Sequence, residues 1–228
     1  MLPVARWIHA VAERAPSALA LQAADGDLDY AAFAGRIDAV ATALAAAGIG
    51  AGDRVAWLGL NSAGLLATLF ACAARGAILA PLNWRLAPPE HRALLERTAP
   101  ALLVAEEPWL AACAEPGSVP QGTRCVAKVD ADQPVPAGWQ RWDEFVGSRA
   151  HGIASAPFEA AAAAQDPQDP QAPLLLSFTS GSTGEPKGVL LSHRAWAANG
   201  DASVDMHALT ERDRVLTTLP LFHVGGLN

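Results

Sequence analysis

The segment from Ser177 to Val189 reads SFTSGSTGEPKGV, and its residue types are the ones in this chain best suited to chemistry. Three glycines, at positions 181, 184 and 188, allow tight turns and close approach of the backbone to a ligand. The hydroxyl groups and Lys187 can donate hydrogen bonds to phosphate oxygens, and consecutive backbone N–H groups can form an anion-binding concavity. The segment therefore indicates phosphate binding.

Two other interpretations of this segment are weaker. The P-loop pattern G-x-x-x-x-G-K-[ST] needs glycine before the lysine and Ser or Thr after it, whereas this chain has Pro186 and Gly188 there. An exposed flexible turn would also be rich in glycine and serine. The segment follows the apolar run PLLL directly, however, and ligands of α/β sheets gather at the carboxyl ends of strands. This position favours a phosphate site over an exposed turn.

The elements that must position this segment follow from apolar runs and helical spacing. Runs such as RVAWLGL, AILAPL and ALLVAE predict buried strands, with helices expected between them. This alternation predicts an α/β fold with mostly parallel sheets and helices on both faces. Asp25-Gly26, between two short apolar runs, predicts a hairpin. The expected strands are 54–60, 77–82, 101–106 and 124–129, and the expected helices are 4–14, 31–49, 63–75, 88–100, 107–115 and a short one from 142. Ser62 is expected to be the N-cap of the helix 63–75.

A proline-rich stretch divides the chain. Residues 159–173 read EAAAAAQDPQDPQAP, where proline prevents a continuous helix and predicts a linker. We expect residues 1–170 to form an N-terminal α/β subdomain and residues 171–228 to begin a second one that carries the phosphate-binding loop. In the second part we expect strands at PLLLSF and RVLTTLP, and a helix with Ser192 as its N-cap. Because the last residues resemble the middle of a domain, we expect the chain to be truncated.

Composition limits the classes of function and the compartment. The formal net charge is −7 and no Lys/Arg run is present, which argues against a nucleic-acid partner. The longest apolar region is interrupted by Arg75 and Gly76, so it predicts a core helix followed by a strand and not a membrane span. The three cysteines lack metal-ligand spacing, and Cys72 is expected to be a small buried hydrophobe. We expect a cytoplasmic protein.

Several stretches together resemble a known family. TSGSTGEPKG closely resembles, over all ten positions, the phosphate-binding signature of the adenylate-forming (AMP-binding) enzymes. ARGAILAPLNWRLAPPEH is similar to the acyl-CoA synthetase, or carboxylate–CoA ligase, branch, where Asn-x-Arg-Leu is common. PLFHVGGL is similar to the segment that lines the acyl pocket in that branch. The resemblance covers essentially the whole chain and implies an incomplete N-terminal domain of such an enzyme.

The resemblance implies an ATP-dependent ligase reaction and two sets of site residues. A carboxylic acid and ATP would give an acyl-adenylate and pyrophosphate, and coenzyme A would then displace AMP. The implied ligands of the ATP phosphates, with Mg²⁺ sharing the task, are Thr179, Ser180, Gly181, Ser182, Thr183, Gly184 and Lys187. The implied acyl-substrate pocket contains His223, Gly225 and Gly226, although a structural role for His223 is an equal alternative.

Some features of this reaction have no assigned residue here. In the resembling family, later segments supply the adenine pocket, the metal carboxylate, the ribose-binding Asp and a C-terminal lysine. We therefore assign no catalytic residue and no metal ligand, and we expect the isolated chain to be inactive. The Asn-x-Arg-Leu stretch leans towards fatty or aromatic acids. Two alternatives stay open: a non-catalytic phosphate-binding or interaction module that retains the fold, or the adenylation domain of another adenylate-forming enzyme.

Overall fold

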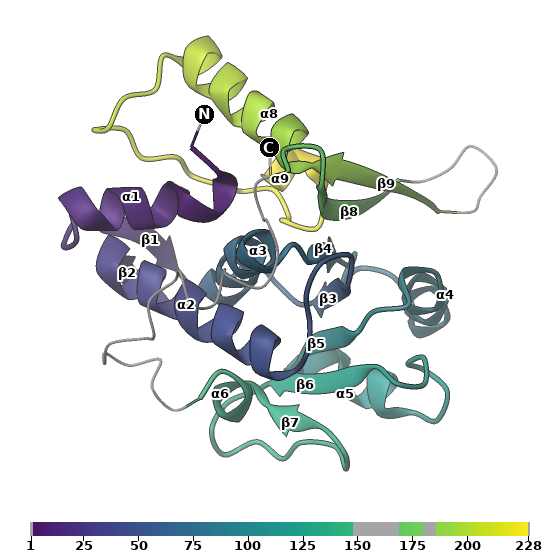
Figure 1. Cartoon of the computed structure of the whole chain (residues 1–228). Helices are drawn as coiled ribbons and strands as arrows, with labels where there is room; N and C mark the ends of the chain where they lie inside the picture. Colours follow the sequence, from purple (N-terminus) through teal and green to yellow (C-terminus); the bar gives the residue numbers. More distant parts are fainter. Residues whose placement is uncertain (1, 148–168, 180–185, 228) are drawn as a thin grey trace.

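A computed structural model describes residues 2–147, 169–179 and 186–227. Its described strands form one sheet in the order β7-β6-β5-β3-β4-β8-β9 and a separate β1-β2 hairpin (Figure 1). All neighbours in the larger sheet are parallel except β8 and β9, which confirms the prediction of a mostly parallel sheet. The strands of the larger sheet are β3 (Arg54–Leu58), β4 (Ile78–Pro81), β5 (Leu102–Glu106), β6 (Arg124–Lys128), β7 (Gln140–Arg141), β8 (Pro173–Thr179) and β9 (Lys187–Ser192).

Helices cover both faces of this sheet because successive side chains of a strand point to opposite faces. In β3, Val55 and Trp57 join the core cluster that contains α2 and α3, whereas Ala56 and Leu58 join the cluster that contains α4 and α5. The helices of the first face are α1 (Trp7–Arg14), α2 (Tyr30–Ala46) and α3 (Ala63–Arg75), and those of the second are α4 (Pro88–Thr98) and α5 (Glu107–Ala114). The remaining described helices are the 3-10 turn η1 (Val4–Arg6), α6 (Trp142–Phe145), α8 (His193–His207) and α9 (Val224–Leu227).

Local signals in the sequence account for several element boundaries. The predicted hairpin consists of β1 (Leu19–Ala23) and β2 (Gly26–Asp29), and Gly26 takes a φ of 115°, which L-residues with side chains rarely adopt. Ser62 caps α3 by accepting a hydrogen bond from the Leu65 N–H at 3.3 Å. Ser192 caps α8 in the same way with the Ala195 N–H at 3.2 Å. Both predicted caps are confirmed.

One predicted strand is wrong and two strands were missed. Residues 214–220 carry no strand, and the side chains of Val215 and Leu216 are 72% and 85% exposed. An apolar, β-branched run favours an extended backbone, but a strand also needs a neighbour to pair with, and the described residues provide none there. The missed strands are β7 and β9. β9 was overlooked because its first residues were interpreted as the end of the glycine-rich segment.

The predicted division of the chain stays a prediction. Most of the proline-rich stretch lies outside the described residues, and the expected boundary near residue 170 lies beside it. Across that boundary, β8 pairs with β4 in parallel, with Leu175 opposite Leu79. Strands from the two expected parts therefore share one sheet. Within the described ranges, every helix is too short or too polar to cross a bilayer.

Candidate functional site

Two of the sequence-predicted phosphate ligands lie opposite each other on neighbouring strands. Thr179 ends β8 and Lys187 begins β9, and the two residues are register partners in the antiparallel pair. The Thr179 Oγ1 donates a hydrogen bond to the Lys187 carbonyl oxygen at 3.4 Å, and both residues are exposed. Directly opposed residues place their side chains on the same face. A hydroxyl and an ammonium group therefore share one end of this hairpin.

The other predicted phosphate ligands, Ser180, Gly181, Ser182, Thr183 and Gly184, lie outside the described residues. The strand that precedes them, β8, is held in place by its buried side chains. Leu174 and Leu175 of β8 are buried in the core, and Ser177 is also buried. A Cβ on Gly188 would meet the Leu176 side chain at 3.0 Å, so β9 lies close against β8 at this point.

Asn61 holds the segment that contains the predicted acyl-pocket residues. Its Nδ2 donates to the Leu219 carbonyl at 2.9 Å, and its Oδ1 accepts from the Leu221 N–H at 2.8 Å. Asn61 comes shortly after β3 ends at Leu58, so residues 219–221 lie beside the carboxyl end of a central parallel strand. Because ligands of α/β sheets bind outside the carboxyl ends of strands, this segment lies where a ligand site would be expected.

An aromatic contact fixes the next residue of the same segment. The Phe222 ring packs edge-on against Trp84, with centroids 6.0 Å apart, and Trp84 follows β4. The Arg85 guanidinium lies 4.7 Å from the Trp84 ring centroid and 5.9 Å from that of Phe222. These contacts bring the Asn-Trp-Arg-Leu stretch and the Pro-Leu-Phe-His stretch together, although more than a hundred residues separate them in the sequence.

His223 is exposed and hydrogen-bonded within its own turn. Its Nδ1 accepts a hydrogen bond at 3.1 Å from the N–H of Gly225, which lies in α9. A neutral His223 in this arrangement therefore carries its proton on Nε2. A Cβ on Gly226 would lie 2.3 Å from the Pro220 carbonyl oxygen, so backbone packing requires glycine at that position. The role of these three residues in an acyl pocket stays a prediction.

Among the described residues, no hydrogen bond joins the predicted phosphate ligands to the predicted acyl-pocket residues. Within the two groups, hydrogen bonds join Thr179 to Lys187 and Gly225 to His223. Sequence reasoning also missed Asn61, Trp84 and Arg97 as supports. The Arg97 Nη1 donates to the Pro186 carbonyl at 2.9 Å. These residues are far in the sequence from the groups that they contact. The only sign of their role is that Asn61 and Trp84 each follow a strand and that Arg97 lies on a helix.

A charged cluster at the ends of β5 and β6 was also missed. The Glu106 carboxylate accepts from the Leu60 N–H at 2.9 Å and lies 3.1 Å from the Lys128 Nζ. The Asp25 carboxylate lies 4.0 Å from the same ammonium group and accepts from the Ala63 N–H at 3.2 Å. The contacts with Lys128 and the Leu60 N–H give the buried Glu106 carboxylate its partners, and Asp25 connects the β1-β2 turn to the start of α3. The cluster therefore stabilises the carboxyl ends of β5 and β6 and the loop that follows β3.

Burial raises the thiol pKa of all three cysteines. Cys72 is fully buried, and burial raises its thiol pKa, which confirms its interpretation as a small core residue. Burial also raises the pKa of Cys113 and of Cys125 to about 11 in each case. The described residues contain no group of three or more His, Cys, Asp or Glu side chains that could hold a metal ion.

Comparison with known proteins identifies the family. The family described as "AMP-binding enzyme" matches residues 8–228. The chain belongs to this family. It is 43% identical over its whole length to the indoleacetate–CoA ligase of Aromatoleum aromaticum, of which it covers 42%. It is 33% identical to the feruloyl-CoA synthase of an Amycolatopsis species, with 97% of this chain and 40% of that protein covered.

A solved structure agrees with the observed fold. The N-terminal domain of FACL13 from Mycobacterium tuberculosis has a TM-score of 0.80 and 26% identity, and the match covers 100% of this chain and 53% of that one. The chain thus corresponds to an N-terminal portion of an adenylate-forming AMP-binding enzyme and spans less than half the length of the two ligases. The sequence-based assignment to this family is confirmed.

Proposed function

We propose that this chain is the part of a carboxylate–CoA ligase that binds the triphosphate of ATP. The family membership supports adenylate-forming chemistry, and the names of the two similar ligases state that the acceptor is coenzyme A. Both names also state an aromatic acid as substrate. We therefore favour an aromatic carboxylic acid as the substrate of the whole protein over the fatty acids that the sequence equally allowed.

The proposed reaction has two steps. A carboxylate oxygen attacks the α-phosphorus of ATP, the bond from that phosphorus to the bridging oxygen of the β-phosphate breaks, and pyrophosphate leaves. The sulfur of coenzyme A then attacks the acyl carbon, the bond to the AMP oxygen breaks, and the thiol proton is released. The protein must reduce repulsion between a carboxylate and a polyanion in the first step, so it must neutralise and orient the phosphates.

The pairing of Thr179 with Lys187 is the observation that carries this proposal. Lys187 is exposed, and no described carboxylate forms an ion pair with it. The Thr179 hydroxyl lies on the same face of the hairpin, and it can donate its one proton to a phosphate oxygen in exchange for its 3.4 Å hydrogen bond to the Lys187 carbonyl. Between them runs the segment Ser180 to Gly184, for which we propose binding of the β- and γ-phosphates through backbone N–H and hydroxyl groups.

The described residues contain no group of three or more His, Cys, Asp or Glu side chains that could hold a metal ion by themselves. Mg²⁺ prefers oxygen ligands and is usually held by one or two carboxylates together with the phosphates of the nucleotide, whose charge it would share with Lys187. We also propose that His223, Gly225 and Gly226 form part of an acyl pocket. Their segment lies at the ends of β3 and β4, where Asn61 and Trp84 hold it.

Titration calorimetry of the chain with tripolyphosphate and with Mg·ATP tests the phosphate site. We expect Lys187→Ala to weaken binding of both by about ten- to a hundredfold, because a hydrogen bond to a charged group contributes about 1.5–3 kcal/mol. Arg212→Ala is the matched control, since it removes one exposed positive charge from the turn after α8. Its affinity should stay near that of the wild type. Absence of wild-type binding, or equal affinities for Lys187→Ala and wild type, would contradict the proposal.

A further inference from the structure

The start of β9 is held from one side only. β9 is the last strand of the sheet, and its Val189 and Leu190 side chains are 43% and 57% exposed. Its inner edge pairs with β8 from Lys187 to Ser192. At the other end of the strand, the His193 N–H donates to the Ala172 carbonyl at 3.1 Å and anchors the exit into α8. The entry into β9, at Pro186 and Lys187, needs a separate anchor.

Arg97 provides this anchor. It lies in the last turn of α4 and is exposed, and its Nη1 donates to the Pro186 carbonyl oxygen at 2.9 Å. The two residues are 89 positions apart in the sequence, so the bond connects two distant elements. The donor is a guanidinium group, whose hydrogen bonds are stronger and more directional than those of neutral donors.

The geometry of the peptide bond makes this contact relevant to Lys187. The Pro186 carbonyl belongs to the planar peptide unit that ends at the Lys187 Cα. The proline ring already restricts φ at position 186 to about −65°. A hydrogen bond that holds the carbonyl therefore also holds the plane of this peptide unit, and with it the direction in which the Lys187 side chain leaves the backbone.

We propose that Arg97 is a positioning residue that orients Lys187 for binding of a polyphosphate, an inference that rests on the proposed function. Arg97 acts through the backbone of Pro186 and need not touch the ligand. Without this contact, Lys187 samples more backbone orientations, and binding must restrict them.

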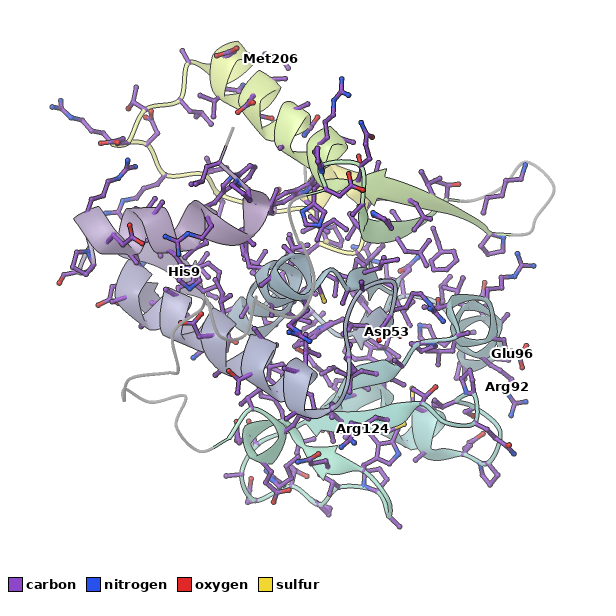
Figure 2. All side chains as sticks on the ribbon, in the orientation of Figure 1. His9, Asp53, Arg92, Glu96, Arg124 and Met206 are labelled. Carbon is purple, nitrogen blue, oxygen red and sulfur yellow. The ribbon has the colours of Figure 1, made fainter. Side chains whose placement is uncertain are left out.

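Arg92 allows a matched control on the same helix. It is exposed on the outer side of α4, where Figure 2 labels it together with Glu96. Its Nη2 also donates to a proline carbonyl, that of Pro116, at 3.1 Å. Arg92→Met therefore removes the same charge and the same kind of bond as Arg97→Met, but from a residue that does not contact the hairpin in the described contacts.

The test compares tripolyphosphate affinity by calorimetry in wild type, Arg97→Met, Arg97→Lys and Arg92→Met, with a thermal melt of each. We expect Arg97→Met to bind about five- to tenfold more weakly, because binding must then restrict the orientation of Lys187, which Arg97 no longer holds. Arg97→Lys should recover most of the affinity, because lysine can still donate to the carbonyl. Arg92→Met should change affinity by less than about twofold, as expected for an exposed charge. Amide hydrogen exchange at Lys187 should be faster in Arg97→Met than in wild type.

The outcomes distinguish failure of the positioning role of Arg97 from failure of the proposed phosphate site. If wild type binds tripolyphosphate and Arg97→Met binds equally well, the positioning role is wrong and the phosphate site stands. Equal losses in Arg97→Met and Arg92→Met would assign the effect to general charge and also reject it. A lower melting temperature without rescue by Arg97→Lys would indicate a structural role instead. If wild type does not bind at all, the proposed function fails and this inference fails with it.

Discussion

His193 shows how a single buried side chain can make the stability of this chain depend on pH. It begins α8, is buried, and has no hydrogen-bond partner for its Nε2 among the described residues. Burial lowers its pKa from the model-compound value of 6.5, and the nearby Asp169 opposes this only in part. The unfolded chain therefore takes up a proton at a higher pH than the folded chain does.

The sign of the resulting pH dependence follows from proton linkage. Because the unfolded state binds more protons below about pH 6.5, the free energy of unfolding should fall as pH decreases from 7 to 5. His193→Asn should reduce this slope, as measured by urea denaturation at several pH values. Ser192→Ala is the control, since loss of the N-cap costs about 1 kcal/mol without removing a titrating group. A wild-type slope in His193→Asn would refute the assignment.

At the residue scale, sequence reasoning succeeds where the relevant partner is close in the chain. Ser62 and Ser192 were predicted as caps because each bonds to a backbone N–H three residues later. Thr179 and Lys187 were selected by their chemical type, and the structure places them opposite each other. Arg97 could not be selected, since an exposed arginine on a helix gives no sign of a carbonyl 89 residues away.

At the element scale, the packing of α9 against the turn before it depends on one close backbone approach. Gly226→Ala would place a Cβ in α9 2.3 Å from the Pro220 carbonyl oxygen, a backbone atom that cannot rotate away. We expect this variant to lose about 1–3 kcal/mol of stability, the range typical of overpacking, as measured by chemical denaturation. Gly225→Ala is a matched control, because its nearest contact would be the His223 Nδ1 at 3.4 Å. Equal stability of the two variants would contradict this explanation.

Elements differ in how well their sequence patterns predict them. β3, β4 and β5 are continuous apolar runs between helices, so their burial in a parallel sheet could be expected. RVLTTLP has similar residue types, yet it forms no strand, because hydrogen-bond pairing depends on a neighbouring chain segment. The opposite holds for β9. Lysine and glycine at its start favour a loop, but the segment forms a strand because β8 offers a free edge to pair with.

At the scale of the whole molecule, one part of the chain exposes most of the large apolar side chains. Most of the exposed large apolar side chains that the structure describes lie between residues 189 and 219, on β9, on α8 and in the segment that follows; they are Val189, Leu190, Val204, Met206, Val215, Leu216 and Leu219. Figure 2 labels Met206 near the far end of α8. Extended apolar surface of this kind favours association with another chain.

We therefore expect the isolated chain to self-associate with increasing concentration, as measured by sedimentation velocity. The double variant Met206→Ser/Leu216→Ser should weaken association, because these side chains are 75% and 85% exposed. Leu2→Ser removes an exposed leucine from the N-terminal end of the described chain and should leave association unchanged. A concentration-independent monomer would show that this surface does not drive association.

The sequence by itself determined the α/β class, the two helix caps, the buried helix and strand around Arg75 and Gly76, and the family to which the chain belongs. These features depend on local spacing or on a contiguous signature, both of which can be read along the chain. Only the tertiary structure decided that β9 pairs with β8, that Asn61 and Trp84 hold the His223 segment, and that Arg97 contacts Pro186. These features depend on which distant groups come within hydrogen-bonding or packing distance after folding, and linear order does not specify those distances.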